Sequence, residues 1–137
     1  MSNLKKTERK LWKVAVIGCG AFANWEYLPN IRSEANADIV AAVDIIPERA
    51  QNACVDYGIP NWYGSVSELL EKCDFDIAID AASIQAHHEI NMAVLSAGKH
   101  LITQKPAAPS VELFDKQTAL AKKNNVKMVC VPIHPMR

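Results

Sequence analysis

The feature that most limits the fold is a glycine-rich hexapeptide placed directly after an apolar run near the N-terminus. The run Trp12 to Ile17 predicts a buried strand, and Gly18-Cys19-Gly20-Ala21-Phe22-Ala23 follows it without a spacer. The segment Phe22 to Arg32, interrupted by Pro29, then predicts a short helix. The order strand, glycine turn, helix is the opening of a βαβ unit.

Patterns typical of strands and helices alternate from there to the end of the chain. Apolar runs predict further strands at Ile39 to Val43, Trp62 to Tyr63, Ile77 to Asp80, His100 to Thr103 and Val126 to Val131. Helices are predicted between them, at Pro47 to Tyr57, after Ser65, at His88 to Ala97 and at Val111 to Asn124. Such alternation needs right-handed crossovers, which place helices on both faces of a parallel sheet. The predicted fold is therefore α/β, a doubly wound parallel sheet of the Rossmann type with three layers, α/β/α.

Serines mark two of the helix starts. Ser65, with Glu68 three residues later, is a predicted N-cap, and Ser110 is the predicted N-cap of the last helix. The apolar side of that last helix is expected to comprise Leu113, Phe114, Ala119, Leu120 and Ala121.

The length and the charge balance limit the class of protein. A chain of 137 residues suits one domain, and we assign residues 1–11 to a polar N-terminal tail and residues 12–137 to the domain. With 15 basic and 15 acidic side chains, nothing in the net charge favours nucleic acid as a partner. Neither a membrane span nor a secretory signal is apparent, so a cytoplasmic protein is expected.

The cysteines and histidines show no metal-binding spacing. The four cysteines, Cys19, Cys54, Cys73 and Cys130, are scattered without a C-x-x-C pair and are expected to be reduced and mostly buried. The sequence therefore predicts no metal site.

The glycine turn carries the first functional prediction. In this context Gly18 permits a tight turn, Gly20 lets the backbone approach a pyrophosphate, and Ala23 keeps the helix close to the sheet. Free N–H groups at the start of the helix, around Ala21 and Phe22, would face the anion. The alternative is a strand-to-helix turn that binds no ligand.

Asp44 ends the second predicted strand, where a carboxylate can accept hydrogen bonds from the hydroxyls of an adenosine ribose. A 2′-phosphate would meet like charge there, so Asp44 favours NAD over NADP, while the nearby Arg49 leaves NADP as an alternative. The other interpretation is that Asp44 caps the helix beginning near Pro47.

The joint order of several motifs resembles the N-terminal half of the Gfo/Idh/MocA family of oxidoreductases. The resemblance covers about residues Lys13 to Val131. The motifs, in chain order, are the glycine turn, Asp44, Ser67-Glu68-Leu69-Leu70, Asp76-Ile77-Ala78, His87, Ala97-Gly98-Lys99-His100 and Lys105-Pro106. Members typically oxidise or reduce sugars, inositols and related polyols with NAD(P).

The resemblance implies a catalytic role for Lys105. The family carries Glu-Lys-Pro after the fifth strand, with its lysine beside the nicotinamide and the reacting carbon, and this chain has Gln104-Lys105-Pro106. A lysine there could hydrogen-bond the substrate oxygen. Gln104 departs from the family because a neutral amide supplies no negative charge beside the lysine. Without the resemblance, Lys105 would be interpreted as a surface lysine.

Three more residues are implied to lie at the cofactor. Ala82-Ser83 stands where family members commonly have Thr-Pro, and the Ser83 hydroxyl can still donate or accept. His87 matches a family histidine in the same loop, and the alternative for it is a packing or capping role.

The resulting functional prediction is the NAD(P)-binding domain of an oxidoreductase that acts on CH–OH groups by hydride transfer. The resemblance implies that a C-terminal substrate domain is absent, so the chain alone is expected to bind dinucleotide without useful turnover. It also implies a small sugar or polyol substrate and a homo-oligomer. The alternatives are a non-catalytic dinucleotide-sensing module and a methyltransferase, in which the Gln104-Lys105-Pro106 triplet would have no place.

Overall fold

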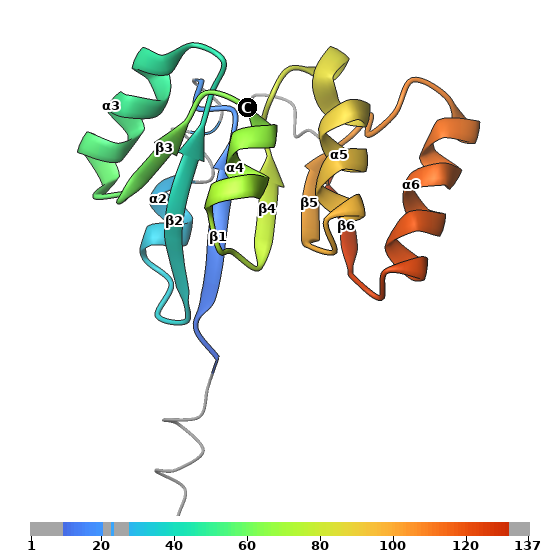
Figure 1. Ribbon diagram of the computed structural model, residues 1–137, viewed down its shortest axis with the longest axis horizontal. Coiled ribbons are helices and arrows are strands. Elements are labelled where there is room, and N and C mark those ends of the chain that lie inside the picture. The colour runs from blue at the N-terminus through green and yellow to red at the C-terminus, as the bar shows by residue number, and fades with distance from the viewer. Residues whose placement is uncertain (1–9, 21–22, 24–27, 132–137) are drawn as a thin grey trace, which may run out of the picture.

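In the computed structural model, which describes residues 10–20, 23 and 28–131, a six-stranded parallel sheet forms the centre of the molecule (Figure 1). The strands are β1 (Trp12–Ile17), β2 (Ala37–Val43), β3 (Asn61–Tyr63), β4 (Ile77–Asp80), β5 (His100–Gln104) and β6 (Met128–Val131). The helices are α2 (Leu28–Arg32), α3 (Pro47–Tyr57), α4 (Val66–Lys72), the 3-10 turn η2 (Ile84–Ala86), α5 (His87–Ser96) and α6 (Val111–Lys123).

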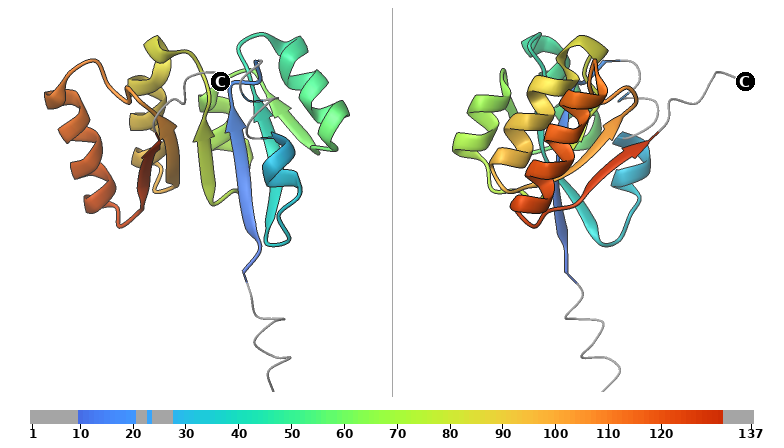
Figure 2. Two further views of the ribbon diagram at one scale, coloured as in Figure 1. Left: turned by 180° about the vertical axis from the view of Figure 1, so that it is seen from behind. Right: turned by 90° about the vertical axis from the view of Figure 1, so that its right-hand side faces the viewer.

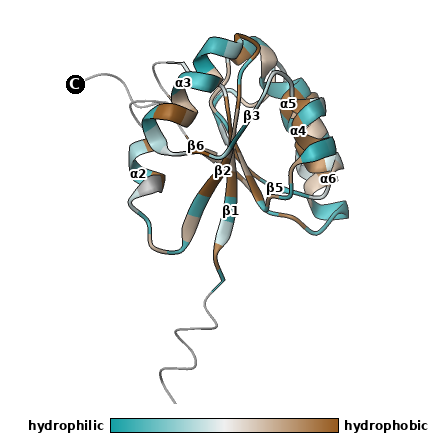
Figure 3. Ribbon diagram, turned by 60° about the vertical axis from the view of Figure 1, so that its left-hand side comes forward, coloured by the Kyte–Doolittle hydropathy of each residue, from teal (hydrophilic) through white to brown (hydrophobic). Residues whose placement is uncertain are grey.

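Helices cover both faces of the sheet. Figure 2 shows α4, α5 and α6 stacked on one side of the strands and α2 on the other, and Figure 3 shows α3 on the same side as α2. The sheet accordingly divides the core into two apolar clusters. One contains Leu28 of α2 and Ala50 of α3, and the other contains Leu69 of α4 and Leu95 of α5. The predicted three-layer α/β/α architecture is confirmed.

The order of the strands decides where a ligand can bind. The sheet runs β3-β2-β1-β4-β5-β6, so the chain builds outward from β1 in one direction and then returns to build outward from β4 in the other. All pairs are parallel, and the carboxyl ends of the strands therefore lie along one edge. In folds of this kind the crevice opens at the point where the order reverses, here between β1 and β4.

Most predicted boundaries agree with the structure to within one or two residues. β1, α3 and β4 begin and end where the pattern places them, and Gly58 closes α3 in the left-handed conformation with φ +67°. Ser65 caps α4, since its hydroxyl accepts the Glu68 N–H at 3.1 Å. Within the predicted helix Phe22 to Arg32, the described part is α2, and Pro29 is its second residue. The segments 21–22 and 24–27 lie outside the described residues.

The prediction for the inward side of α6 was partly wrong. Ala119 is exposed, while the polar Gln117 is completely buried and shares the inner row with Ala121. A polar residue takes this place because its amide finds hydrogen-bond partners on α5 and on the loop after β5.

Replacing Ser110 by alanine is expected to lower the free energy of unfolding by about 1 kcal/mol. The Ser110 hydroxyl accepts the Leu113 N–H at 3.2 Å, and it fixes the start of α6 next to the loop that carries Lys105. Urea unfolding would measure the loss, with Ser96→Ala at the exposed last residue of α5 as the control. An equal loss in both variants would contradict a contribution from the cap.

Candidate functional site

A cavity of about 360 Å³ opens at the carboxyl edge of the sheet, where β1, β2 and β4 end. Its walls come from the glycine turn, from the segment after β2 and from the loop after β4. The lining residues are Ile17, Gly18, Gly20, Val43, Asp44, Ile45, Ile46, Arg49, Ser65, Val66, Ala81, Ala82, Ser83, Ala86 and Ile90. The volume falls within the range of small-molecule sites, and the lining is mostly apolar with a few polar groups.

Gly18 is a position that only glycine fits. Its φ of +93° lies in the left-handed region, and a Cβ built on it would lie 2.6 Å from the backbone nitrogen of Ala82 and 2.7 Å from the carbonyl of Ala81. The absence of a side chain lets the turn after β1 pack directly on the loop after β4. Gly18 therefore joins two walls of the cavity.

Gly20 leaves open the space that its missing side chain would occupy. Among the described residues, a Cβ there would meet only the guanidinium of Arg49, at the ordinary contact distance of 3.8 Å, so packing against this part of the chain does not require glycine. The position lines the cavity, and a bare backbone there lets an anionic group approach the chain. Ala23 is fully buried against the sheet, whereas Ala21 and Phe22 lie outside the described residues.

Asp44 connects the end of β2 to the glycine turn. Its Oδ2 accepts the backbone N–H of Cys19 at 2.8 Å, and its Oδ1 accepts that of Ile46 at 2.9 Å. The helix that follows has Ile46 as its N-cap residue and no side-chain cap, so Asp44 forms a local turn rather than a helix cap. A carboxylate oxygen has room for more than one hydrogen bond, so the lone pairs that remain can still accept a ribose hydroxyl.

The carboxylate also affects the neighbouring thiol. Burial, together with the negative charge of Asp44, raises the pKa of Cys19 to about 12. Cys19 is therefore an unreactive thiol within the turn.

Lys105 follows β5, two strands along the sheet from the glycine turn. Gln104 is buried and Lys105 is exposed, and the backbone N–H of Lys105 donates to the Val131 carbonyl at 2.9 Å. Burial raises the pKa of the Cys130 thiol, while the positive charge of Lys105 acts in the opposite direction, which indicates that the lysine lies near this β6 residue. The described lining of the cavity does not include Lys105.

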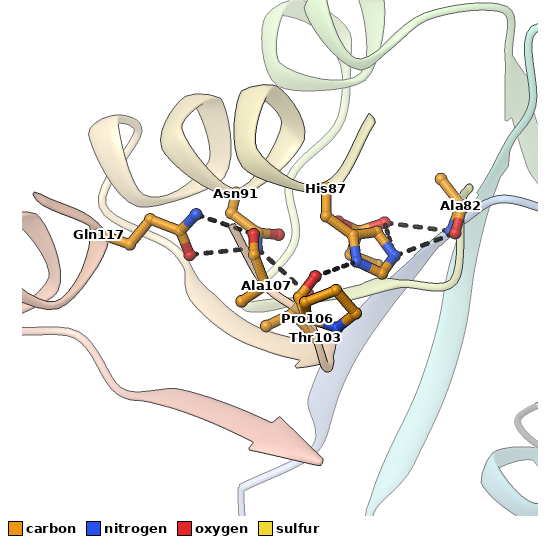
Figure 4. Close-up of polar contacts among 8 residues, drawn as sticks. Ala82, His87, Asn91, Thr103, Pro106, Ala107 and Gln117 are labelled. Atoms are coloured by element: carbon orange, nitrogen blue, oxygen red, sulfur yellow. Dashed lines mark hydrogen bonds and ion pairs between the residues drawn. The ribbon is translucent and has the colours of Figure 1, made fainter. Parts of the chain in front are cut away.

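His87, the first residue of α5, lies beneath the loop after β4 and is fully buried. Its Nε2 lies 3.0 Å from the Ala82 carbonyl oxygen and its Nδ1 lies 3.1 Å from the Pro106 carbonyl oxygen (Figure 4). It thus contacts both the wall of the cavity and the residue after Lys105. The Asp80 carboxylate lies 3.9 Å from Nε2, and burial raises the pKa of that carboxyl to about 6 although the histidine lowers it.

A second buried polar group holds the same loop one residue further on. The amide of Asn91, one turn after His87 on α5, donates to Thr103 Oγ1 at 3.2 Å and to Gln117 Oε1 at 3.2 Å. Gln117 in turn donates to the Ala107 carbonyl at 3.0 Å (Figure 4). The loop that carries Lys105 is therefore fixed by side chains of α5 and α6 at two successive carbonyls.

Comparison with known families decides what this arrangement belongs to. Residues 12–132 match the profile of GFO_IDH_MocA, described as an oxidoreductase family with an NAD-binding Rossmann fold. The chain belongs to the Gfo/Idh/MocA family. The predicted resemblance and the predicted fold are both confirmed, and the cavity at the β1/β4 crevice is where such a fold binds its dinucleotide.

Relatives within the Gfo/Idh/MocA family include proteins of known activity. The inositol 2-dehydrogenase/D-chiro-inositol 3-dehydrogenase of Lactiplantibacillus plantarum is 30% identical over 122 residues, which cover 85% of this chain and 35% of that enzyme. The chain thus spans about a third of the length of such relatives.

Solved structures of the family superpose closely on the chain. An oxidoreductase from Agrobacterium radiobacter in complex with NAD⁺, L-tartaric acid and magnesium gives a TM-score of 0.83 at 25% identity and covers 88% of this chain and 35% of that one. A 3-ketoreductase from Actinomadura kijaniata in complex with NADP and TDP-benzene gives 0.80 at 26% identity, with 87% and 36% covered. Both nicotinamide dinucleotides therefore occur in Gfo/Idh/MocA structures of this fold.

The predicted site residues of this Gfo/Idh/MocA chain fall into two places. The cavity lining includes Gly18, Gly20, Asp44, Ala82 and Ser83. Of the other predicted residues that the structure describes, Ala23 and His87 are buried, and Gln104 and Lys105 lie further along the carboxyl edge.

Sequence analysis missed several residues that shape the site. Asp80 and Asn91 are completely buried polar residues, and Ile45 and Ile46 form an apolar wall of the cavity. One signal was present: His87 and Asn91 are four residues apart, which places them on one face of α5.

Among the described residues, no helix is long and apolar enough to cross a membrane.

Proposed function

We propose that this chain is the nucleotide-binding part of a dehydrogenase that moves hydride between NAD and a CH–OH group of a sugar, an inositol or a related polyol. The observation that carries the proposal is the cavity formed by the glycine turn, Asp44 and the Ala82-Ser83 wall, with Lys105 on the same edge of the sheet. The inositol dehydrogenase of Lactiplantibacillus plantarum supports the class of substrate.

The residues of the cavity fit a dinucleotide. The open backbone at Gly20 accommodates a pyrophosphate, Asp44 accepts ribose hydroxyls, and the exposed Ile45 and Ile46 offer an apolar surface to a purine. When bound, the nicotinamide supplies the hydride acceptor or donor. Lys105 then donates a hydrogen bond to the substrate oxygen and stabilises the charge that develops on it.

The choice between the two dinucleotides follows from the charges near the ribose. Asp44 disfavours a 2′-phosphate, while the Arg49 guanidinium close to Gly20 would attract one. Because Asp44 is held in place by two backbone N–H groups and Arg49 is an exposed side chain, we propose NAD as the preferred cofactor.

The cell compartment and the partners belong to the same proposal. All four cysteines are free thiols, which suits a reducing compartment such as the cytoplasm. We place the remaining contacts to a small sugar or polyol in a further domain of a longer protein, and we expect that protein to form a homo-oligomer.

A second candidate is a dinucleotide-sensing module without chemistry. The observation that favours it is Gln104, a neutral and buried residue where the family has glutamate beside the lysine. Hydride transfer to NAD in the presence of a polyol by the longer protein would exclude this candidate, and binding of NAD without any turnover would support it.

Calorimetric titration tests the proposed function. NAD is expected to bind with micromolar to sub-millimolar affinity, and NADP about tenfold more weakly. Lys105→Ala is expected to change the affinity for NAD by less than about threefold, because the lysine acts on the substrate rather than on the adenosine half. If neither nucleotide binds, the proposal is overturned. A large loss of NAD affinity in Lys105→Ala would show that this residue contacts the cofactor.

A further inference from the structure

The hydrogen-bond partners of His87 differ in kind from those of the other described histidines. Both ring nitrogens of His87 face carbonyl oxygens, those of Ala82 and Pro106, and a carbonyl can only accept. A neutral imidazole carries one N–H, so it would leave one nitrogen with its lone pair directed at a carbonyl lone pair in a fully buried place. Only the doubly protonated ring satisfies both contacts.

His88 and His100 provide the contrast. Nδ1 of His100 accepts the backbone N–H of Lys127 at 3.0 Å, and Nδ1 of His88 lies 2.8 Å from the side-chain nitrogen of Gln117, which can only donate. Each of these rings therefore needs a lone pair on Nδ1, and neutral rings fit their surroundings.

A buried imidazolium needs a counter-charge, and Asp80 supplies it. Asp80 is completely buried at the end of β4, and its Oδ1 lies 3.9 Å from Nε2 of His87. Among the described residues, no carboxylate other than that of Asp80 lies within 4 Å of either ring nitrogen. The Ala82 N–H donates to the same Oδ1, whereas Asp80 Oδ2 has no hydrogen-bond partner in the described part of the chain. Burying an uncompensated carboxylate here would cost free energy, and so would burying an unpaired imidazolium. Each charge therefore compensates the other.

We propose that His87 is an imidazolium ion paired with Asp80, and that this buried pair positions the Lys105 loop against the wall of the cofactor cavity. One N–H of the ring binds Ala82, which packs on Gly18, and the other binds Pro106, which follows Lys105. His87 is thus a positioning residue that sets the distance between the nucleotide site and the lysine. The assignment of Lys105 to the chemistry rests on the proposed function, whereas the ion pair does not.

The protonation state can be observed directly by NMR on the nucleotide-free chain labelled with ¹⁵N in histidine. At about pH 7, both ring nitrogens of His87 are expected to resonate as protonated nitrogens, each with a directly bonded proton. His88 and His100 serve as controls in the same spectrum, each with an unprotonated Nδ1. An unprotonated ring nitrogen on His87 at this pH would overturn the proposal.

Two substitutions test the counter-charge. Asp80→Asn keeps the shape of the side chain and removes its charge, and one ring nitrogen of His87 is then expected to lose its proton at about pH 7. Asp74→Asn, which changes an exposed carboxylate paired with Lys13, is the matched control and leaves the His87 signals unchanged. A His87 that stays doubly protonated in Asp80→Asn would overturn the pairing with Asp80.

His87→Gln tests the positioning. The two N–H groups of a glutamine amide share one nitrogen, so they cannot reach two carbonyls that face separate nitrogens of the imidazole ring, and the loop loses one attachment. Hydrogen exchange of the Lys105 amide is expected to become about 5- to 100-fold faster, and that of the Asp44 amide, bonded to Tyr63 across the sheet, to remain unchanged. Equal exchange at Lys105 in both proteins would overturn the positioning role. If the variant does not fold, the wild-type spectrum still decides the protonation of His87, on which the positioning depends.

These readouts separate this proposal from the proposed function. A doubly protonated His87 in a chain that binds neither NAD nor NADP would support the ion pair and overturn the cofactor assignment. Binding of NAD by a chain with a neutral His87 would support the cofactor assignment and overturn the ion pair.

Discussion

Replacing Gly18 by alanine is expected to lower the free energy of unfolding by about 3 to 5 kcal/mol and to abolish measurable NAD binding. Two costs add at this position. The φ of +93° is strained for any residue with a Cβ, and that Cβ would lie 2.6 to 2.7 Å from the backbone of Ala81 and Ala82, which has no flexible end that could move aside. The loop after β4 would have to shift, and it forms the opposite wall of the cavity.

Gly58→Ala is the matched control for this prediction. Gly58 also has a positive φ, of +67°, but no atom of the described residues lies within 4 Å of a Cβ built on it. The backbone strain alone is expected to cost about 1 kcal/mol there, with NAD binding retained. Urea unfolding and calorimetry on both variants give the comparison. Equal losses of stability would contradict the close approach of Gly18 to Ala82.

Much of the fold could be predicted from the sequence because local signals agree with one another. The apolar run Trp12 to Ile17, the left-handed glycine at Gly58 and the serine cap at Ser65 each specify a boundary from a few neighbouring residues. The carboxyl edge then follows from the parallel arrangement alone, since every strand ends there. Local chemistry and topology together place Gly18 and Asp44 at one cavity.

The buried polar residues behind the site could not be predicted in the same way. The Asn91 amide nitrogen and the Gln117 amide hydrogen-bond to each other and to the carbonyl of Ala107, which comes from a different part of the chain. Asp80 ends an apolar strand, and only the fold brings His87 near it. Periodicity assigns polar residues to the surface, so it does not predict a buried pair whose hydrogen bonds come only from tertiary contacts.

Asp44 was predicted from its place in the sequence and also makes tertiary contacts that the sequence does not show. Its replacement by alanine is expected to change both stability and NAD affinity. Its position after β2 predicts a ribose contact, and the structure adds two hydrogen bonds to backbone N–H groups that the sequence did not show. Asp44→Ala leaves the buried N–H of Cys19 without its acceptor, at a cost of about 1 to 3 kcal/mol in stability. It also removes the carboxylate that would accept the ribose hydroxyls.

The affinity of Asp44→Ala for NAD is therefore expected to fall by about 10- to 100-fold. The affinity for NADP should fall less, because the substitution also removes the repulsion of the 2′-phosphate, so the preference for NAD narrows. Calorimetric titration of both nucleotides measures this, with Asp38→Ala, an exposed carboxylate on the same strand, as the control. If Asp44→Ala loses stability but binds NAD as tightly as the wild type, Asp44 only holds the glycine turn, and the ribose contact has to come from elsewhere in the cavity.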